Sequence, residues 1–210
     1  MSEAELKSAQ ESEIVALERE RLAMYMLWPP DRPTPQIPIL APGFRLRALA
    51  SEHFDQARPT VEIDGALTDT QWNSFRNQVL PDGLFVVEDQ QSAAWVGTVS
   101  AVHNPTASRF YFPGGGELGY LLVAPQYRNR GLGSALICAA VERFRRAGYH
   151  HIFLGVQGWR LAAIRCYVRA GFQPFLHAPE LAPRWTAIFQ VLGLEANETH
   201  WPTRLLEPTS

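Results

Sequence analysis

The alternation of apolar and polar residues in the first half of the chain predicts a group of neighbouring strands. Residues 44–49 read Phe-Arg-Leu-Arg-Ala-Leu, the two-residue period of a strand with one buried face. Residues 83–88 and 93–99 are mainly apolar and are joined by Asp-Gln-Gln-Ser, which is the pattern of a β-hairpin. Between these strands we expect a short helix from Ser51 and a longer one near residues 70–79.

The second half of the chain alternates predicted strands with predicted helices. We expect, in order, a strand over 117–123, a helix over 132–146, a strand over 152–156, a helix over 160–170 and a last strand over 185–192. The helix over 132–146 repeats apolar residues every four positions along one side. This order predicts an α/β domain with a mixed sheet.

The N-terminal part differs in composition from the rest. Residues 2–27 are strong helix formers without Gly or Pro, so we expect a helix there. Six prolines then follow within fourteen positions, a composition that excludes helix and inner strand and indicates an extended connector. We therefore expect a helix and connector over 1–42, the main folded domain over 43–195 and a tail over 196–210. The N-terminal helix is also a candidate homodimer contact.

Bulk composition narrows the class of protein. The chain has 210 residues, 46% hydrophobic and 19% charged, which is typical of a globular domain. Its net charge of −2 gives no basic excess for binding nucleic acid. The N-terminus lacks the pattern of a signal peptide, and no run approaches the ~18 apolar residues of a membrane span, so we expect a cytoplasmic protein that binds no membrane.

Metal binding and a disulfide are not expected. His150 and His151 are adjacent, but no second pair of ligands accompanies them, so we expect no metal site. Cys138 and Cys166 lie inside predicted helices and are expected to be free, buried thiols.

The most informative segment links the strand at 117–123 to the helix at 132–146. It reads Arg128-Asn129-Arg130-Gly131-Leu132-Gly133-Ser134. Backbone N–H groups at a helix start lack partners within the helix and lie at the positive end of its dipole, so they bind anions. The glycines allow close approach and the arginines add positive charge, which predicts a diphosphate site.

Two well-known phosphate-binding motifs do not fit this loop. A P-loop needs Lys followed by Ser or Thr after its last glycine, whereas Ser134 and Ala135 follow Gly133. A dinucleotide-binding fingerprint needs a third glycine near Leu136 and an acidic residue about 20 positions later, and neither is present.

The loop does resemble the pyrophosphate motif of the GNAT superfamily of acyl-CoA N-acetyltransferases: Gln or Arg, two residues, Gly, one residue, then Gly or Ala. Residues 128–133 match it in full, and residues 163–172 resemble the family's second signature, a helix with Tyr, three residues and Gly-Phe. The resemblance spans about residues 44–193. It implies an α/β fold: a mixed, mostly antiparallel sheet flanked by helices, here with an added N-terminal helix.

The resemblance implies a set of cofactor contacts for acetyl-CoA. The main chain of Leu122 and Val123 would pair with the pantetheine arm, because family strands splay apart at this place. Arg160 stands where the second signature usually has Asn, and is expected to contact CoA phosphates or to cap a surface. The pyrophosphate would be held by the amides of Arg128, Asn129, Arg130, Gly131, Leu132, Gly133 and Ser134.

The resemblance also implies catalytic roles. Tyr167 would donate a proton to the departing CoA thiolate; otherwise it is a core aromatic residue. Glu117 is the candidate base for the acceptor amine, with a solvent-facing strand end as the alternative. Its side chain is expected on the same face as Gly119 and Leu121. Tyr120 and His103 are lesser candidates.

We therefore expect an acetyl-CoA-dependent N-acetyltransferase that acts on a primary amine, of a small molecule or a peptide, in a ternary complex. Neither cysteine is placed as a nucleophile. The alternative is a non-catalytic acyl-CoA sensor or interaction module on the same fold. The sequence leaves the acceptor open.

Overall fold

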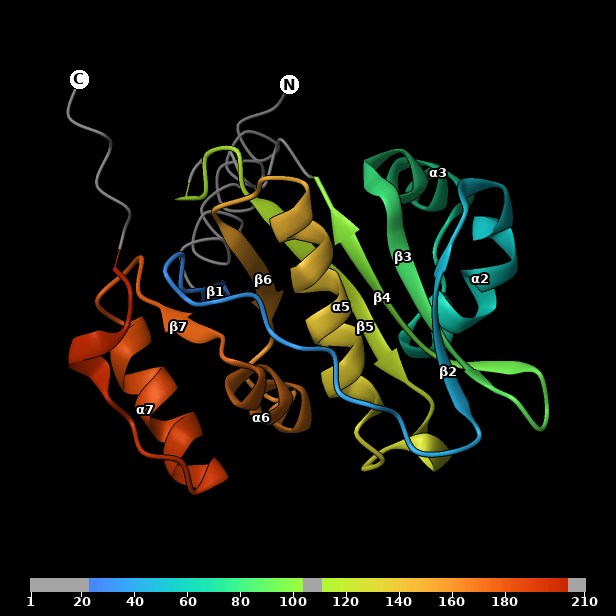
Figure 1. The fold of residues 1–210 in the computed structure, drawn as a ribbon. Coiled ribbons are helices and arrows are strands. Elements are labelled where there is room, and N and C mark those ends of the chain that lie inside the picture. The colour runs from blue at the N-terminus through green and yellow to red at the C-terminus, as the bar shows by residue number, and fades with distance from the viewer. Residues whose placement is uncertain (1–22, 104–110, 204–210) are drawn as a thin grey trace, which may run out of the picture.

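A computed structural model describes residues 23–103 and 111–203. It contains a seven-stranded sheet in the order β2-β3-β4-β5-β6-β1-β7, flanked by helices on both faces (Figure 1). All neighbouring strands are antiparallel except β5 and β6. The expected mixed, mostly antiparallel sheet is therefore confirmed.

The strands lie close to their predicted positions in the middle of the chain. Their bounds are β1 Met24–Trp28, β2 Phe44–Leu49, β3 Val79–Asp89, β4 Ala94–Val102, β5 Gly116–Val123, β6 Ile152–Val156 and β7 Gln173–Phe175. The α-helices are α2 Phe54–Val61, α3 Asp69–Gln78, α5 Leu132–Arg146, α6 Leu161–Ala170 and α7 Leu181–Leu192. None of the helices in the described ranges is long and apolar enough to cross a membrane.

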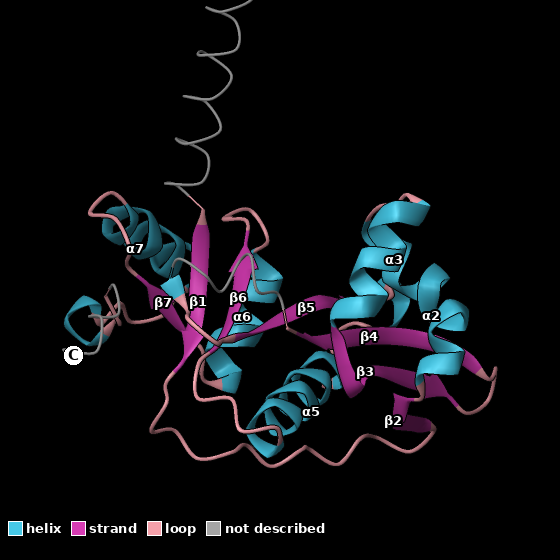
Figure 2. Ribbon diagram, turned by 90° about the horizontal axis from the view of Figure 1, so that it is seen from above, coloured by secondary structure: helices cyan, strands magenta, loops and turns pink. Residues whose placement is uncertain are grey.

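The two faces of the sheet carry different helices. On one face α5 and α6 pack into the main core, to which Leu136, Phe144 and Ile164 contribute. On the other face α2 and α3 cover β2–β4 with a second core that includes Trp72 and Phe75. Figure 2 shows α2 and α3 on the opposite side of the sheet from α5. The two faces are called below the α5 face and the α3 face.

The prediction of a helix through residue 27 is wrong at its end, because Met24–Trp28 forms the strand β1. This strand pairs with both β6 and β7, so the sheet begins before the expected domain boundary at residue 43. Both of its faces are covered: Met24 and Met26 enter the main core, and Leu27 enters a small aromatic core. A strand covered on both faces shows no alternation in sequence. Residues 1–22 of the predicted helix lie outside the described residues.

The predicted last strand over 185–192 is also wrong, because these residues belong to α7. Leu181, Trp185 and Phe189 recur every four residues and are buried, whereas Val191 is 70% exposed. That spacing is helical, but it becomes visible only when Leu181 is included. The last strand of the sheet is instead β7, a three-residue strand.

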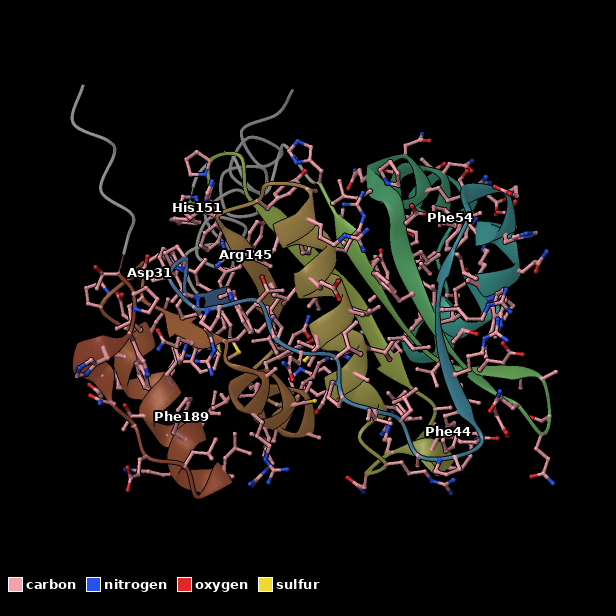
Figure 3. The ribbon with its side chains drawn as sticks, viewed as in Figure 1. Asp31, Phe44, Phe54, Arg145, His151 and Phe189 are labelled. Atoms are coloured by element: carbon pink, nitrogen blue, oxygen red, sulfur yellow. The ribbon has the colours of Figure 1, made fainter. Side chains whose placement is uncertain are left out.

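The proline-rich connector between β1 and β2 contains no helix or strand, as predicted. Arg145 of α5 fixes its first part, since the guanidinium donates hydrogen bonds to the carbonyls of Pro29, Pro30 and Arg32. Figure 3 shows Arg145 near the start of the connector, beside Asp31. The connector then leads past α5 to the far edge of the sheet (Figure 1).

Candidate active site

The centre of the sheet contains an opening between two parallel strands. Within the described residues, β5 and β6 pair only at Gly116 with Ile152 and at Glu117 with Phe153. Beyond these pairs the strands diverge, as Figure 2 shows. The opening therefore exposes the unpaired edge of β5 from Leu118 to Val123, and an extended chain can add to that edge. The splayed strands expected from the family resemblance are confirmed.

The predicted anion-binding loop lies at the wide end of this opening. It follows β5 through a short 3₁₀ turn, Pro125–Tyr127, and leads into α5 at Leu132. The first hydrogen bond within the helix runs from the amide of Ala135 to the carbonyl of Gly131, at 3.2 Å. The three preceding amides, of Leu132, Gly133 and Ser134, therefore have no acceptor inside α5 and are available to an anion.

Two residues of the loop have left-handed backbone conformations, which turn the chain into the helix. Asn129 has a φ of 62° and Gly131 a φ of 79°. Asn is among the few non-glycine residues that adopt this region readily. No atom outside its chain neighbours lies within 4 Å of the position that a Cβ would occupy at Gly131. The backbone at Gly131 therefore faces open space, as an approaching phosphate requires.

The two arginines of the loop stabilise it through side-chain contacts. Arg128 Nε donates to the carbonyl of Val123 at 3.0 Å, which ties the loop to the end of β5. The Arg130 guanidinium lies 5.8 Å from the ring centre of Phe44 and 5.5 Å from that of Tyr127. The Tyr127 hydroxyl in turn donates to Asp89 at 3.0 Å. Both guanidinium groups remain exposed beside the helix start, where they add positive potential.

The packing of α5 against α6 explains why residue 133 is a glycine, which the sequence did not reveal. A Cβ at this position would lie 3.3 Å from Cys166 Sγ of α6, so the glycine allows α5 and α6 to approach closely. Ser134 Oγ lies 3.7 Å from the same sulfur. Cys166 therefore packs directly against the anion-binding helix start. Burial raises the pKa of the Cys166 thiol, which keeps it protonated at neutral pH.

Tyr167 follows Cys166 on α6 and reaches the main core, where it is 7% exposed. Its ring packs edge-on against Phe172 at 6.0 Å. Burial raises the pKa of the Tyr167 phenol far above its usual value, and the charge of Arg160 opposes the shift only in part. The phenol is therefore a neutral proton donor at physiological pH. The Arg160 guanidinium lies 4.7 Å from the ring centre of Trp159, at the start of α6.

Glu117 lies at the narrow end of the opening and is partly buried. It pairs with Phe153 on β6 and Val102 on β4, and Gly119 pairs with Ser100. Paired residues share a face, and Val102 belongs to the core under α2 and α3. Glu117 and Gly119 therefore share one face of the sheet, as expected, and it is the α3 face.

The expectation for Leu121 is wrong because β5 contains a bulge. The register shifts between the pairs Ser100–Gly119 and Thr98–Leu122, which leaves Tyr120 and Leu121 opposite one residue of β4. Tyr120 has a φ of 50°, the strained residue of this bulge. Leu121 consequently packs into the core on the α5 face. An alternating sequence pattern does not reveal such an inserted residue.

The two lesser candidates for the base, Tyr120 and His103, lie on different faces of the sheet. Tyr120 contacts Phe75 of α3, so it shares the face of Glu117. His103 instead packs its ring against Tyr149, which belongs to the group around α5. His103 is therefore on the wrong face to share a substrate with Glu117.

The predicted catalytic residues lie on different faces of the sheet. Tyr167 is buried in the main core on the α5 face, and Glu117 lies on the α3 face. The loop over 128–134 lies at the wide end, where Leu122 and Val123 end the edge of β5. Among the described residues, no group of three or more His, Cys, Asp or Glu side chains could hold a metal ion.

Comparison with known proteins identifies the family to which this chain belongs. The acetyltransferase (GNAT) family matches residues 46–172. A mycothiol acetyltransferase of Amycolatopsis mediterranei is 30% identical over 148 residues, which cover 64% of this chain and 48% of that protein. An uncharacterized N-acetyltransferase, YobR of Bacillus subtilis, is 31% identical over 91 residues, which cover 43% of this chain and 33% of that protein. The chain thus spans about half or less of the length of these curated relatives.

Solved structures with the same fold include a GCN5-related N-acetyltransferase from Sphaerobacter thermophilus. It superimposes with a TM-score of 0.58 at 21% identity, over 78% of this chain and 53% of that chain. At this identity the likeness shows the fold. The family match, in contrast, covers more than half of the chain and includes both signatures. The protein belongs to the GNAT acetyltransferase family.

Proposed function

We propose that the protein is an N-acetyltransferase that moves the acetyl group of acetyl-CoA to a primary amine by direct attack within a ternary complex. The observation that carries this proposal is the opening between β5 and β6. The amides at the start of α5 lie at one end, the neutral phenol of Tyr167 is buried in the core on one face, and the carboxylate of Glu117 lies on the other face.

Acetyl-CoA would lie along this opening. The amides around residues 128–134 would hold its pyrophosphate, with Arg160 near the start of α6 as a further cationic contact. The pantetheine arm would pair with the free edge of β5 at Leu122 and Val123. An N–H of that edge would also donate to the thioester oxygen as negative charge develops there.

Transfer then requires two proton movements on opposite faces of the sheet. Glu117, directly or through a water molecule, takes a proton from the acceptor ammonium, and the neutral amine attacks the thioester carbon. The attack forms the C–N bond and a tetrahedral intermediate, whose collapse breaks the C–S bond as Tyr167 gives its proton to the departing thiolate. The second proton of the attacking nitrogen is then lost to solvent as the amide forms, and solvent restores the proton of Tyr167. Separate faces suit this chemistry because the amine and the leaving group lie on different sides of the carbonyl carbon.

Both thiols are expected to be protonated, which favours direct transfer over an acetyl-cysteine intermediate. Burial raises the pKa of Cys138 as well as that of Cys166, so neither thiol supplies much thiolate at neutral pH. Cys138 is also buried inside α5, where an acyl group has no room.

Two of the curated relatives are named mycothiol acetyltransferases, from Amycolatopsis mediterranei and Saccharomonospora viridis. This chain spans 48% of the first and 30% of the second. The acceptor that those names imply is therefore not assigned to this protein.

The test begins with calorimetric titration of the purified protein with acetyl-CoA and with fragments that lack the pyrophosphate. Binding that requires the pyrophosphate supports the loop assignment, and replacement of Gly131 by Val should abolish it, since φ is 79° there. A panel of amines is then assayed for release of CoA and for acetylated product. Tight cofactor binding without turnover on any amine would instead favour the acyl-CoA sensor.

A further inference from the structure

Among the described residues, two glycines lie on the α3 face near Glu117, one on each strand that borders the opening. Gly119 of β5 lies on this face, two residues beyond Glu117. Gly155 of β6, two residues beyond Phe153, is also on it and is exposed although it lies within a strand. The two strands that border the opening therefore present only backbone at the level where an acceptor would meet the thioester.

One side of this bare stretch is bounded by the Tyr120 wall, which consists of Tyr120 and Phe75. The bulge in β5 places the Tyr120 ring against Phe75 of α3, with ring centres 4.5 Å apart. Tyr120 is 38% exposed, so part of its ring remains open to a ligand. Burial, and to a smaller extent the charge of Glu117, raises the pKa of the Tyr120 phenol.

The other side is bounded by the Tyr25 wall, which consists of Tyr25, Tyr111 and His177. The His177 ring centre lies 4.5 Å from that of Tyr111 and 5.6 Å from that of Tyr25. His177 Nε2 donates to the carbonyl of Ala23 at 2.8 Å, which fixes the ring. A Cβ at Gly155 would lie 3.7 Å from the Tyr25 ring, so this wall stands directly beside the bare backbone.

The two walls lie on strands that are separated by one strand of the sheet. Tyr25 pairs with Gly155, so β1 lies one strand beyond β6, and β5 lies on the other side of β6. Two strand spacings amount to about 10 Å where strands are regularly paired, and β5 and β6 diverge beyond Glu117. The strands that carry the two walls are therefore more than about 10 Å apart beyond Glu117.

The charged residues around Glu117 also limit how many charges the acceptor can carry. Glu117 supplies a carboxylate, and beside it Phe112 stacks on Phe153 with ring centres 4.2 Å apart. Arg76, which follows Phe75 on α3, already pairs with Asp55 at 2.9 Å. The described surroundings thus offer one negative charge and several aromatic faces, a combination that attracts a single ammonium group on an apolar body.

We propose that the acceptor is a primary amine on an aromatic or branched apolar skeleton with no second charge, and that Tyr120 is a residue that determines this specificity. The aromatic body would lie between the Tyr120 wall and the Tyr25 wall, over Gly119 and Gly155. Its ammonium group would then face Glu117. This inference rests on the proposed function.

The experiment compares acceptors and variants with the full chain. Phenethylamine, isobutylamine, spermidine and glucosamine are assayed with saturating acetyl-CoA, and acetylated product is measured by mass spectrometry. We expect kcat/KM for phenethylamine to exceed that for spermidine and glucosamine by about tenfold or more, which corresponds to burial of part of a phenyl ring.

Three substitutions and one control variant locate the source of this preference. Tyr120→Asn removes the ring but tolerates the positive φ, and should lower kcat/KM for phenethylamine about tenfold. Tyr120→Phe keeps the ring and should preserve the preference. Ile63→Asn is the matched control, because Ile63 is a similarly exposed side chain, at 40%, beyond the end of α2. Tyr25→Ser tests the opposite wall independently.

The outcomes separate this inference from the proposed function. Acetylation of amines without preference for phenethylamine, or a preference that survives both Tyr120→Asn and Tyr25→Ser, overturns the inference alone. Binding of acetyl-CoA without acetylation of any amine overturns the proposed function. In that case the inference is judged by binding of phenethylamine to the acetyl-CoA-loaded protein, and binding that Tyr120→Asn leaves unchanged contradicts it.

Discussion

The two halves of the sheet are built differently. Strands β2, β3, β4 and β5 form a continuous antiparallel ladder in which each strand pairs with the next along the chain. Strands β6, β1 and β7 form a second antiparallel group, in which β1 comes from the start of the described chain and lies between its two partners. Two residue pairs, Gly116–Ile152 and Glu117–Phe153, join the halves.

In the proposed function, this difference places the chemistry at the joint. Each half has helices of its own, α2 and α3 on the first and α6 and α7 on the second, whereas the main core is shared, because it includes Val99 of β4 and Leu154 of β6. At the joint, the edge of β5 keeps hydrogen-bonding groups that a cofactor can pair with. Glu117 belongs to the first half and Tyr167 to the second, so the two proposed proton transfers require both halves in register.

The largest effect is expected from breaking the joint itself. A Cβ at Gly116 would lie 2.2 Å from Phe144 Cε1 and 3.0 Å from Tyr149 Cδ1. Gly116→Ala should therefore lower the free energy of unfolding by about 3 kcal/mol, as overpacking of a rigid core does. Urea denaturation measures this change.

Two further variants test the cause of that loss. Gly155→Ala is the control, because the nearest atom to its Cβ would be a Tyr25 ring carbon at an ordinary 3.7 Å. Phe144→Leu combined with Gly116→Ala removes the clashing ring atoms and should recover part of the stability. If Gly116→Ala were as stable as Gly155→Ala, the joint would be more adaptable than its packing indicates.

The next largest effect concerns the proton donor of the second half. Tyr167→Phe should lower kcat about 100-fold, a typical loss for a general acid, with little change in the dissociation constant of acetyl-CoA. Because burial raises the pKa of this phenol, its deprotonation should not reduce kcat below about pH 10, the usual pKa of tyrosine. Stopped assays across pH measure both.

The control for that prediction is Tyr149→Phe. Burial also raises the pKa of Tyr149, but its ring packs on Phe144 and His103 beside Gly116, at the paired end of β5 and not at the end that leads to the loop over 128–134. Unchanged kcat in Tyr167→Phe would assign the proton to water or to another residue.

A smaller effect is expected where α5 and α6 meet across the joint. Gly133→Ala places a Cβ 3.3 Å from Cys166 Sγ, so one helix must shift by a few tenths of an ångström. We expect acetyl-CoA to bind about tenfold more weakly, because the amides at the start of α5 lose their alignment. Cys166→Ala in the same chain provides room and should restore binding. Additive losses in this double-mutant cycle would contradict a direct contact.

These features differ in how far the sequence could predict them. The loop over 128–134 is contiguous, and its glycines, arginines and helix start are visible in order, so its local structure was anticipated. The aromatic side chains on the α3 face could not be grouped from the sequence, because Tyr25, Phe75, Tyr111 and Tyr120 come from four separate segments. The bulge at Tyr120 depends on pairing with β4, and β1 looks like a helix end until its two partner strands are known.

The smallest effect should be confined to the first half. Thr68 Oγ1 accepts from the Gln71 amide at 3.2 Å, and Gln71 Oε1 accepts from the Thr68 amide at 2.9 Å, a capping box that begins α3. Thr68→Ala should lower stability by about 1 kcal/mol, and Thr68→Ser should keep most of it. Acetyl-CoA affinity should be unchanged in both variants, because α3 lies on the face opposite α5. A weaker affinity in Thr68→Ala would mean that strain passes through the joint, and that the two halves are less independent than their hydrogen bonding indicates.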